Sequence, residues 1–378
     1  MIRRTRVEID LAAIVANANE VRRVAGTAVY AVVKADAYGH GAVEVAKALA
    51  ASGAVSGFCT SLVEEGVALR DAGIEAPILV MGPSLVGGED EMVAARLTPV
   101  ISSHEELVAL GYVARGRGAG ADPIQAHLKV DTGMGRLGIA MERAPELAVE
   151  ASRNGIAIVG LMTHFANADT DDPADPDSLT RLQLARFAEV ERAVIAAGAP
   201  VHVRHAANSA AALLFPEARF DLVRTGIAIY GNGHWAERGH MAMRLVTAIA
   251  QLRRIAKGDS VGYGATWTAT RESRLAILPC GYADGLPRSA SGHAEVAIRG
   301  KRVPLVGRIS MDIAVADVTD LPDAQVADAA VLLGKASGGV SISAAEYGAW
   351  TGLSEYEVTC GLSKRVPRLY PAPVERRA

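Results

Sequence analysis

A lysine stands at the end of an apolar run near the start of the chain. Lys34 follows Val29–Val33 and precedes a polar, glycine-containing stretch that ends at Gly41. Desolvation at the end of a buried strand favours the neutral amine, which is nucleophilic enough to form a Schiff base with an aldehyde. The alternative is a lysine whose charged end reaches solvent at the rim of a domain. Taken alone, Lys34 favours the second interpretation.

Further polar groups follow other apolar runs in the first two thirds of the chain. They are Asp131–Arg136, His164, Asn208–Ser209 and Arg224–Ile227. Ser209, at a predicted helix start, and the glycine after Arg224–Thr225 supply donors suited to a phosphate. A lysine, a phosphate site and facing cationic groups together favour pyridoxal 5′-phosphate as a cofactor more strongly than any one of them does.

Eight short apolar runs alternate with helical patterns between about residues 29 and 231. The runs are Val29–Lys34, Gly57–Thr60, Ile78–Gly82, Thr98–Ser102, Ile124–Val130, Ile156–His164, Val201–His205 and Leu222–Tyr230. Between them, apolar residues recur at helical spacing from Ala42 to Ala50, and Ser103 with Glu106 forms the pattern of a capping box. Eight strands alternating with helices predict a parallel (β/α)8 barrel of the TIM type, whose functional groups gather at the carboxyl ends of the strands.

After about Met243 the pattern changes to runs at hairpin spacing. They are Ser273–Leu278, Ala294–Ile298, Val303–Val306, Ile313–Val318 and Ala330–Leu333, with helical periodicity returning at Ser343. The chain is therefore predicted to be an α/β protein with a barrel domain over residues 1–240 and a mainly β domain over residues 241–378. The first ten or so residues are expected to pack with the second domain.

Composition excludes several classes of function. The 378 residues carry 39 Lys and Arg against 42 Asp and Glu, without a basic block that would neutralise a nucleic-acid backbone. No apolar run approaches the ~20 residues of a membrane-spanning helix. Three widely spaced cysteines suggest neither a disulfide framework nor a chelating pair, and His202 and His205 point to opposite faces of a strand. We expect a cytoplasmic protein with no metal, no nucleic-acid partner and no membrane association.

The segments that carry these groups resemble alanine racemases, and the resemblance extends over nearly the whole chain. It rests on Ala31–Gly41 (AVVKADAYGHG), Lys129–Arg136 (KVDTGMGR), Thr163–Ala166, Ala207–Ala211, Arg224–Ile227, Gly262–Thr266, Gly281–Gly285, Gly307–Asp312, Tyr356 and Arg365–Arg368. So many matches in one order make the resemblance specific. It implies a pyridoxal-phosphate enzyme that interconverts L-alanine and D-alanine.

The resemblance implies a two-base mechanism, because racemisation removes the α-proton from one face and returns it to the other. Lys34 carries the cofactor as a Schiff base and exchanges the proton of the D isomer, and Tyr263 serves the L isomer. A tyrosine ordinarily keeps its proton up to about pH 10, so this role requires support from nearby groups such as His164 and Arg224. Arg224 is implied to face the pyridine nitrogen, keep it unprotonated and weaken the ring as an electron sink.

The remaining roles are also implied by the resemblance alone. The cofactor-binding set is Lys34, Tyr38, His164, Asn208, Ser209, Arg224, Gly226, Ile227 and Tyr356. Arg136 and the main chain of Met311 bind the substrate carboxylate, Lys129 is carbamylated in some relatives and orients Arg136, and Tyr282, Arg288 and Arg308 resemble residues of a substrate corridor. Ser310 departs from the cysteine often found at its position, which removes any side-chain role there and leaves the main-chain role of Met311.

Tyr263 is expected to enter the site of a partner subunit, which predicts an obligate homodimer. The product D-alanine is expected to supply peptidoglycan. Three alternatives stay open: a racemase of broader range that includes serine, a basic amino-acid decarboxylase of the same fold, and a noncatalytic pyridoxal-phosphate carrier. No acidic group for a distal amine is identified, which disfavours the decarboxylase, and a carrier has no need of the second domain.

Overall fold

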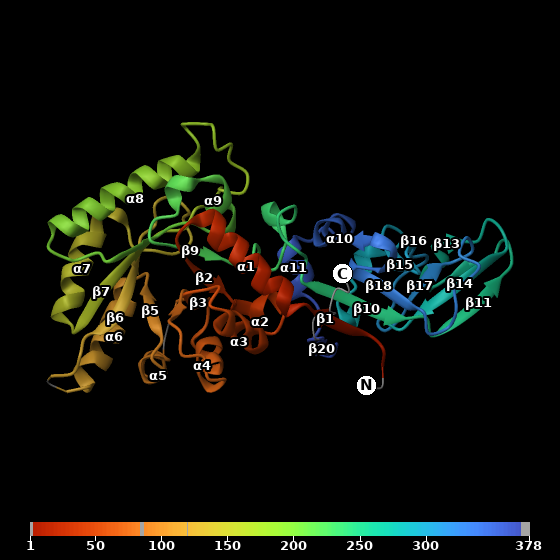
Figure 1. The fold of residues 1–378 in the computed structure, drawn as a ribbon, viewed down its shortest axis with the longest axis horizontal. Helices are drawn as coiled ribbons and strands as arrows, with labels where there is room; N and C mark the ends of the chain where they lie inside the picture. The colour runs from red at the N-terminus through yellow and green to blue at the C-terminus, as the bar shows by residue number, and fades with distance from the viewer. Residues whose placement is uncertain (1–2, 84–86, 119, 372–378) are drawn as a thin grey trace.

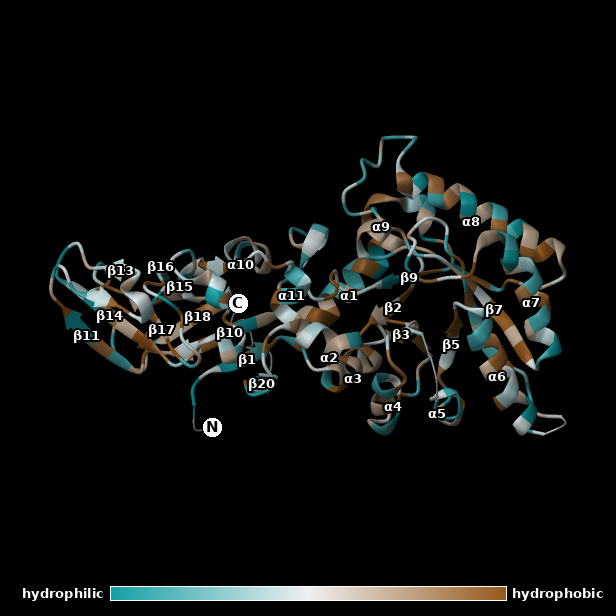
Figure 2. Ribbon diagram, turned by 180° about the vertical axis from the view of Figure 1, so that it is seen from behind, coloured by the Kyte–Doolittle hydropathy of each residue, from teal (hydrophilic) through white to brown (hydrophobic). Residues whose placement is uncertain are grey.

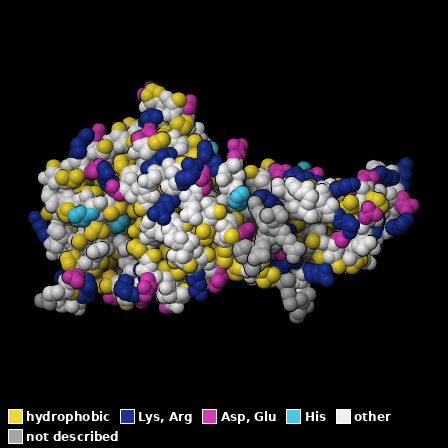
Figure 3. All heavy atoms as spheres, viewed as in Figure 1, with side chains coloured by type: hydrophobic (Ala, Val, Ile, Leu, Met, Phe, Trp, Pro, Cys, Tyr) yellow, Lys and Arg dark blue, Asp and Glu magenta, His cyan; other side chains and the backbone are white. Residues whose placement is uncertain are grey.

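The computed structural model describes residues 3–83, 87–118 and 120–371 of the chain. The molecule is elongated, with two lobes side by side along its longest axis (Figure 1). One lobe is a barrel surrounded by helices, and the other is built mainly from strands. On the face shown in Figure 3, cationic and anionic side chains are interspersed over both lobes.

Eight parallel strands form the barrel. They are β2 (Ala28–Val32), β3 (Gly57–Thr60), β4 (Ile78–Val80), β5 (Thr98–Ile101), β6 (Ile124–Lys129), β7 (Ile156–Met162), β8 (Val203–His205) and β9 (Leu222–Thr225). Their order in the sheet is β8-β7-β6-β5-β4-β3-β2-β9. The two end strands approach through hydrogen bonds from Asp221 N to Arg204 O (3.2 Å) and from Arg224 N to Ala207 O (3.0 Å), so the barrel is nearly closed. Seven of the strands lie within their predicted runs, and β2 begins one residue before its run, at Ala28, so the predicted architecture is confirmed.

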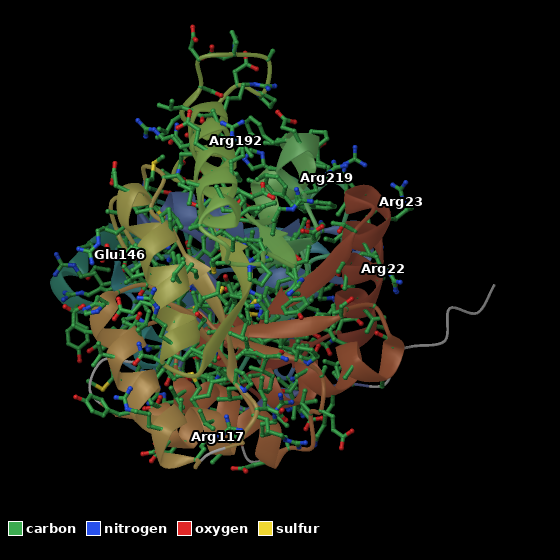
Figure 4. The ribbon with its side chains drawn as sticks, turned by 90° about the vertical axis from the view of Figure 1, so that its left-hand side faces the viewer. Arg22, Arg23, Arg117, Glu146, Arg192 and Arg219 are labelled. Carbon is green, nitrogen blue, oxygen red and sulfur yellow. The ribbon has the colours of Figure 1, made fainter. Side chains whose placement is uncertain are left out.

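Helices surround the barrel. They are α1 (Leu11–Ala25), α2 (Lys34–Gly39), α3 (Ala42–Ser52), α4 (Val63–Asp71), α5 (Glu89–Ala94), α6 (His104–Gly116), α7 (Ala144–Arg153), α8 (Leu179–Ala196) and α9 (Ser209–Leu214). The predicted capping box begins α6, where Ser103 accepts from the N–H of Glu106. Viewed from the barrel end, charged side chains such as Arg192 of α8 and Glu146 of α7 point outward (Figure 4).

Apolar residues fill the barrel on both faces of its strands. Inside, Val32, Cys59, Leu79, Val100 and Met162 form one cluster, contributed by five different strands. Outside, the buried faces of α6, α7 and α8 pack on β6 and β7 in a second cluster. The hydropathy colouring shows hydrophobic strands such as β7 surrounded by helices that carry both hydrophilic and hydrophobic residues (Figure 2). A parallel barrel requires near-continuous apolar strands because both of their faces are covered.

The second lobe consists mainly of antiparallel strands and two short helices. Its strands are β1 (Arg6–Ile9), β10 (Met243–Ala248), β11 (Gln251–Ile255), β12 (Ser260–Val261), β13 (Trp267–Thr268), β14 (Ser273–Leu278), β15 (Glu295–Ile298), β16 (Lys301–Pro304), β17 (Ala314–Asp317), β18 (Ala329–Lys335), β19 (Ser341–Ile342) and β20 (Arg368–Leu369). The helices are α10 (Ala344–Thr351) and α11 (Glu355–Cys360). The largest sheet has the order β16-β15-β18-β10-β1-β20, and β19 pairs with β18.

The chain begins in the second lobe and then enters the barrel. β1 pairs antiparallel with β10 and parallel with β20, and α1 leads from it to β2. One continuous apolar core includes Ile9 of β1, Val29 of the barrel and Leu278 of β14, so the two lobes are packed together. Within the described ranges, every helix is too short or too polar to cross a lipid bilayer.

Candidate active site

A cavity of about 1170 Å³ lies at the carboxyl ends of the barrel strands. Eleven of the predicted site residues line it: Lys34, Tyr38, Lys129, Arg136, His164, Asn208, Ser209, Arg224, Gly226, Ile227 and Tyr356. They come from separate strands and loops that are adjacent only in the folded barrel. The structure therefore brings most of the predicted site together.

Tyr263 and Met311 are not among the residues that line this cavity. Both lie in the second lobe and are exposed, Tyr263 by 71% and Met311 by 53%. Tyr263 begins a turn between β12 and β13. Strand β13 lies in the part of the second lobe that is away from the barrel (Figure 1). The carbonyl of Met311 accepts from Ala283 N (3.0 Å), which ties its loop to the loop of Tyr282. Within one chain, these two residues are separate from the rest of the predicted site.

The short element α2, which carries Lys34 and Tyr38, is a left-handed turn and not a regular α-helix. Residues 35–38 have φ between 51° and 55° and ψ between 40° and 49°. This region is unfavourable for residues with a Cβ, so other contacts must hold it. Glu65 Oε1 accepts from Ala35 N (2.6 Å), and Asp36 Oδ1 accepts from Ala42 N (2.8 Å). The turn projects Lys34 and Tyr38 into the same cavity from one short segment.

Helix α11 of the second lobe covers this turn and contributes Tyr356. A Cβ on Gly39 would overlap the carbonyl of Thr359, so the helix lies directly on the turn. The rings of Tyr38 and Tyr356 are 5.8 Å apart between centroids. Burial is the main cause that raises the pKa of both phenols, so both remain protonated donors at neutral pH.

Donors converge at the start of α9, beside the end of β9. Ser209 Oγ accepts from Gly226 N (3.1 Å) and Ala228 N (3.3 Å). A Cβ on Gly226 would stand 2.5 Å from the hydroxyl of Tyr38, so only glycine allows this close approach. Asn208 Oδ1 accepts from Ala211 N (2.9 Å) and caps the short helix. Hydroxyls and main-chain N–H groups that share a small space are suited to phosphate oxygens.

Arg224 is buried at the cavity floor, only 3% exposed, and does not lie at a solvent-exposed rim. It donates to Thr163 O (2.9 Å), Ala206 O (3.1 Å) and Nδ1 of His164 (3.3 Å), and to Nδ1 of His205 (2.7 Å). None of these partners carries a negative charge. Burial lowers the pKa of Arg224 to about 10, and the guanidinium remains charged at neutral pH. Burial, followed by the charge of Arg224, also holds the pKa of His164 well below its ordinary value, so this imidazole is neutral.

Lys129, at the end of β6, is a second buried cation. Its pKa is lowered from 10.5 to about 8, mainly by burial and then by the charges of Arg224 and Arg136. The following loop is shaped by Asp131, whose Oδ1 accepts from the N–H groups of Gly133 (2.9 Å) and Met134 (2.9 Å). A substantial fraction of neutral Lys129 amine is therefore present near pH 8.

The cavity carries an excess of positive charge. Among its described lining residues, Lys34, Lys129, Arg136 and Arg224 are cationic, and Asp169 and Glu355 are acidic. A ligand with a phosphate and a carboxylate would compensate this excess, and a basic ring nitrogen would accept from Arg224. The donor set therefore fits pyridoxal phosphate with an amino acid. The described residues form no cluster of His, Cys, Asp or Glu suited to a metal ion.

Two residues behind this site are not predicted from the sequence: His205, which bonds Arg224, and His127, which bonds His205. The sequence relates His205 only to the nearby His202, and it gives His127 no partner. The available signal was a histidine within each of two predicted strands, Ile124–Val130 and Val201–His205. Such residues can be recognised as one group only when it is known which strands are adjacent in the barrel.

Comparisons with known proteins identify one family over nearly the whole chain. Residues 9–233 match the family described as "Alanine racemase, N-terminal domain", and residues 242–370 match "Alanine racemase, C-terminal domain". An alanine racemase of Sorangium cellulosum is 43% identical, with 98% of this chain and 100% of that protein covered. The alanine racemase structure from Streptomyces lavendulae has a TM-score of 0.91 at 36% identity, with 99% of each chain covered. The one from Bartonella henselae, "with covalently bound pyridoxal phosphate", has a TM-score of 0.85 at 29% identity, covering 97% of this chain and 99% of that chain.

Proposed function

Because the chain belongs to the alanine racemase family of pyridoxal-phosphate-dependent isomerases, we propose that it interconverts L-alanine and D-alanine with Lys34 and Tyr263 as its two bases. The observation that carries the proposal is the convergence of Lys34, Arg224 and the phosphate-type donors on one cationic cavity. A carboxylate, a phosphate and a primary amine are the groups that such a cavity would bind. The cofactor, when bound, withdraws electrons from the amino acid and so weakens the bond to its α-proton.

The phosphate is assigned to the donors around Gly226. The hydroxyls of Tyr38, Tyr356 and Ser209 and the main chain of Gly226 and Ile227 hold it, and Asn208 fixes the start of α9. Protonated phenols are required for this role, in agreement with the raised pKa of Tyr38 and Tyr356. Lys34 Nζ, at the other side of the turn, is the point of covalent attachment.

Arg224 is assigned to the pyridine nitrogen. A guanidinium can only donate, so a ring nitrogen facing it must act as an acceptor and stay unprotonated. His164 accepts from Arg224 through Nδ1 and therefore presents a protonated Nε2 at the cavity. These two residues keep the ring a weaker electron sink than a carboxylate partner would make it.

Proton exchange is assigned to one residue on each face of the substrate. Lys34 Nζ exchanges the α-proton of D-alanine, and Tyr263 Oη exchanges that of L-alanine. In each direction, one base takes a proton while the other returns one to the opposite face. Arg136 holds the substrate carboxylate through its guanidinium, with a main-chain donor from Met311.

The position of Tyr263 supports a shared site in a homodimer. Tyr263 and Met311 are exposed in the second lobe, together with Tyr282 (43%) and Ile313 (43%). Large exposed apolar side chains that gather in one lobe are suited to an interface. We assign Tyr263 and Met311 to the partner's barrel, and Tyr282, Arg288 and Arg308 to the corridor that leads into it.

Carbamylation of Lys129 is supported by its lowered pKa. Only a neutral amine reacts with carbon dioxide, and this amine is partly neutral near pH 8. The reaction would replace a buried cation by an anion beside Arg136 and fix the guanidinium for the substrate. The test is ¹³C NMR of the protein in ¹³C-bicarbonate. A carbamate signal is expected from the wild type and not from Lys129→Ala. Intact native mass without the adduct, together with a bare amine in a crystal structure, would remove the assignment.

The direct test of function is a coupled assay for D-amino acids on the purified protein. L-Alanine and L-serine are supplied to the wild type, Lys34→Ala and Tyr263→Phe. Production of D-alanine by the wild type alone supports the two-base racemase, and comparison with serine measures substrate range. A folded wild type that binds pyridoxal phosphate and forms no D product would point to a decarboxylase or a carrier.

The proposed role in the cell is supply of D-alanine for peptidoglycan within the cytoplasm. The relatives compared above come from bacteria, in which peptidoglycan contains D-alanine. The three cysteines of the chain are all free thiols, as a reducing compartment would keep them.

A further inference from the structure

Behind the floor of the cavity, Arg224 is connected to a pair of buried histidines. Its Nη1 lies 2.7 Å from Nδ1 of His205, and Nε2 of His205 lies 2.7 Å from Nδ1 of His127. His205 has no exposed surface and His127 is 7% exposed. Neither lines the cavity, so neither touches a ligand there.

The donor properties of the three groups fix where each proton lies. A guanidinium has no acceptor, so Nδ1 of His205 must accept and carries no proton. Burial and then the charge of Arg224 hold the pKa of His205 far below neutrality, and its single proton is therefore on Nε2. That proton is donated to Nδ1 of His127, which leaves the proton of His127 on its own Nε2. One tautomer of each ring is compatible with the chain of hydrogen bonds.

The neighbouring strand leaves space for this arrangement. A Cβ on Gly160 of β7 would overlap the ring of His127, so glycine admits the imidazole between the strands. The two histidine rings are 4.9 Å apart between centroids, at an angle of 60°. Three adjacent barrel strands and β9 therefore form a rigid support for the Arg224 guanidinium.

We propose that His205 and His127 are positioning residues for the racemase, which hold Arg224 as a fixed donor toward the cofactor ring. His205 accepts from one end of the guanidinium, and His127 prevents the His205 ring from turning or changing its tautomer. No proton passes along the chain in this role. The kinetic part of the proposal rests on the proposed function, whereas the tautomers belong to the fold itself.

The tautomers are measured in the wild-type protein, and variants serve only to assign its signals. The holoenzyme and the cofactor-free protein are labelled with ¹⁵N at histidine, and the imidazole nitrogens are observed by NMR at neutral pH. Signals are assigned from those lost in single-histidine variants. Both His205 and His127 are expected to show a proton on Nε2 and none on Nδ1. A proton on Nδ1 of either ring, or two protons on one ring, would overturn the proposal even if the enzyme racemises alanine.

Two substitutions distinguish the role of Nδ1 of His205 from that of its Nε2. The amide of Asn reaches about as far as Nδ1 and can accept from Arg224, whereas the amide of Gln reaches about as far as Nε2. His205→Asn is expected to keep kcat within about threefold of the wild type, whereas His205→Gln lowers it by about tenfold or more, since small misplacements of a site group cost up to ~10²-fold. The absorbance of the bound cofactor is expected to shift only in His205→Gln. His202→Asn, on an exposed neighbour in the sequence, is the matched control and leaves both unchanged.

The outcomes are distinguishable from failure of the proposed function. If the wild type forms no D-alanine, cofactor absorbance and histidine tautomers still measure the role of the pair. Equal losses in His205→Asn and His205→Gln, or no change in either, would show that His205 does not act through its Nδ1 on Arg224. Far-ultraviolet circular dichroism of each variant confirms that a loss does not arise from unfolding.

Discussion

The hydroxyl of Tyr38 lies 2.5 Å from the point that a Cβ on Gly226 would occupy. Tyr38 belongs to the left-handed turn after β2, and Gly226 follows β9, so this contact joins the first and the last strand of the barrel. These strands are also paired directly, from Ala28 with Leu222 to Ala31 with Thr225. The proposed phosphate site is therefore located across a pair of strands far apart in the sequence.

Gly226→Ala is expected to weaken binding of pyridoxal phosphate by about tenfold or more, because the phenol of Tyr38 must move away from the donors. Fluorescence titration of the cofactor-free variant measures this affinity. Gly116→Ala is the matched control, since a Cβ at Gly116 meets nothing within 4 Å. Unchanged affinity in Gly226→Ala would contradict the assignment of Tyr38 and Gly226 to the cofactor.

Mixed dimers of Lys34→Ala and Tyr263→Phe are expected to regain activity that neither variant has alone. A mixed dimer contains one site with an intact Lys34 and an intact Tyr263 from different chains. Random pairing of equal amounts gives about a quarter of the wild-type activity, because half of the dimers are mixed and half of their sites are complete. Co-expression with two affinity tags isolates the mixed species. A mixture that stays inactive would show that each site takes both residues from one chain.

Ala35→Gly is expected to stabilise the protein, although glycine usually destabilises ordered segments. Ala35 is exposed and has φ 51°, where a Cβ costs about 1–2 kcal/mol and the added freedom of glycine in the unfolded chain costs about 0.5–1 kcal/mol. The net gain is roughly 0.5–1 kcal/mol in the free energy of unfolding, measured by urea denaturation. Ala50→Gly, at an exposed position of the right-handed helix α3, is the control and should lower stability by up to ~1 kcal/mol. A loss in Ala35→Gly as large as that in the control would exclude strain in the turn.

The cofactor-free protein is expected to lose stability as the pH falls from about 6.5 to about 4. Burial is the largest cause that lowers the pKa of His40 and of His127 from 6.5 to about 4. The unfolded chain takes up these protons near pH 6.5, whereas the folded chain does so only near pH 4. Over this interval each histidine therefore lowers the free energy of unfolding by up to about 3 kcal/mol.

Denaturation at several pH values between 7.5 and 4.5 isolates this contribution. Carboxylates such as Asp221, whose pKa is lowered from 3.8 mainly by its hydrogen bond to Arg204, act below this range. His40→Gln should reduce the slope of stability against pH, whereas His104→Gln, at an exposed position, should not. The same slope in all three proteins would mean that His40 takes up its proton in the folded chain as easily as in the unfolded one.

The barrel could be predicted because its strands are buried on both faces. Runs such as Ile156–Met162 are apolar throughout, and the helices between them show a clear apolar side. β1 was not predicted as a strand, because four residues with alternating burial give little signal and its partners are β10 and β20. In the second lobe, Val303–Val306 was predicted as a strand, whereas β16 spans Lys301–Pro304, since its register is set by β15.

The site was predicted in its residue types but not in its internal contacts. Ala-Asp-Ala-Tyr gives no sequence signal of a left-handed turn, because Glu65 and α11 hold it from outside. The link from Arg224 to His205 and His127 likewise depends on which strands are neighbours in the barrel. The sequence patterns identify polar residues at the carboxyl ends of strands. The buried residues that contact each other behind the cavity are identified only in the folded barrel.

The pairing of β1 with β10 and β20 has a consequence for the order in which the chain folds during synthesis. Strands β2 to β9 form an uninterrupted stretch, so the barrel can assemble while the ribosome is still translating the rest. β1 emerges before the barrel strands but has no partner until β10 and then β20 follow. Until then its apolar residues Val7 and Ile9 are uncovered, and a nascent chain stalled before β10 is expected to be a preferred client of ribosome-associated chaperones.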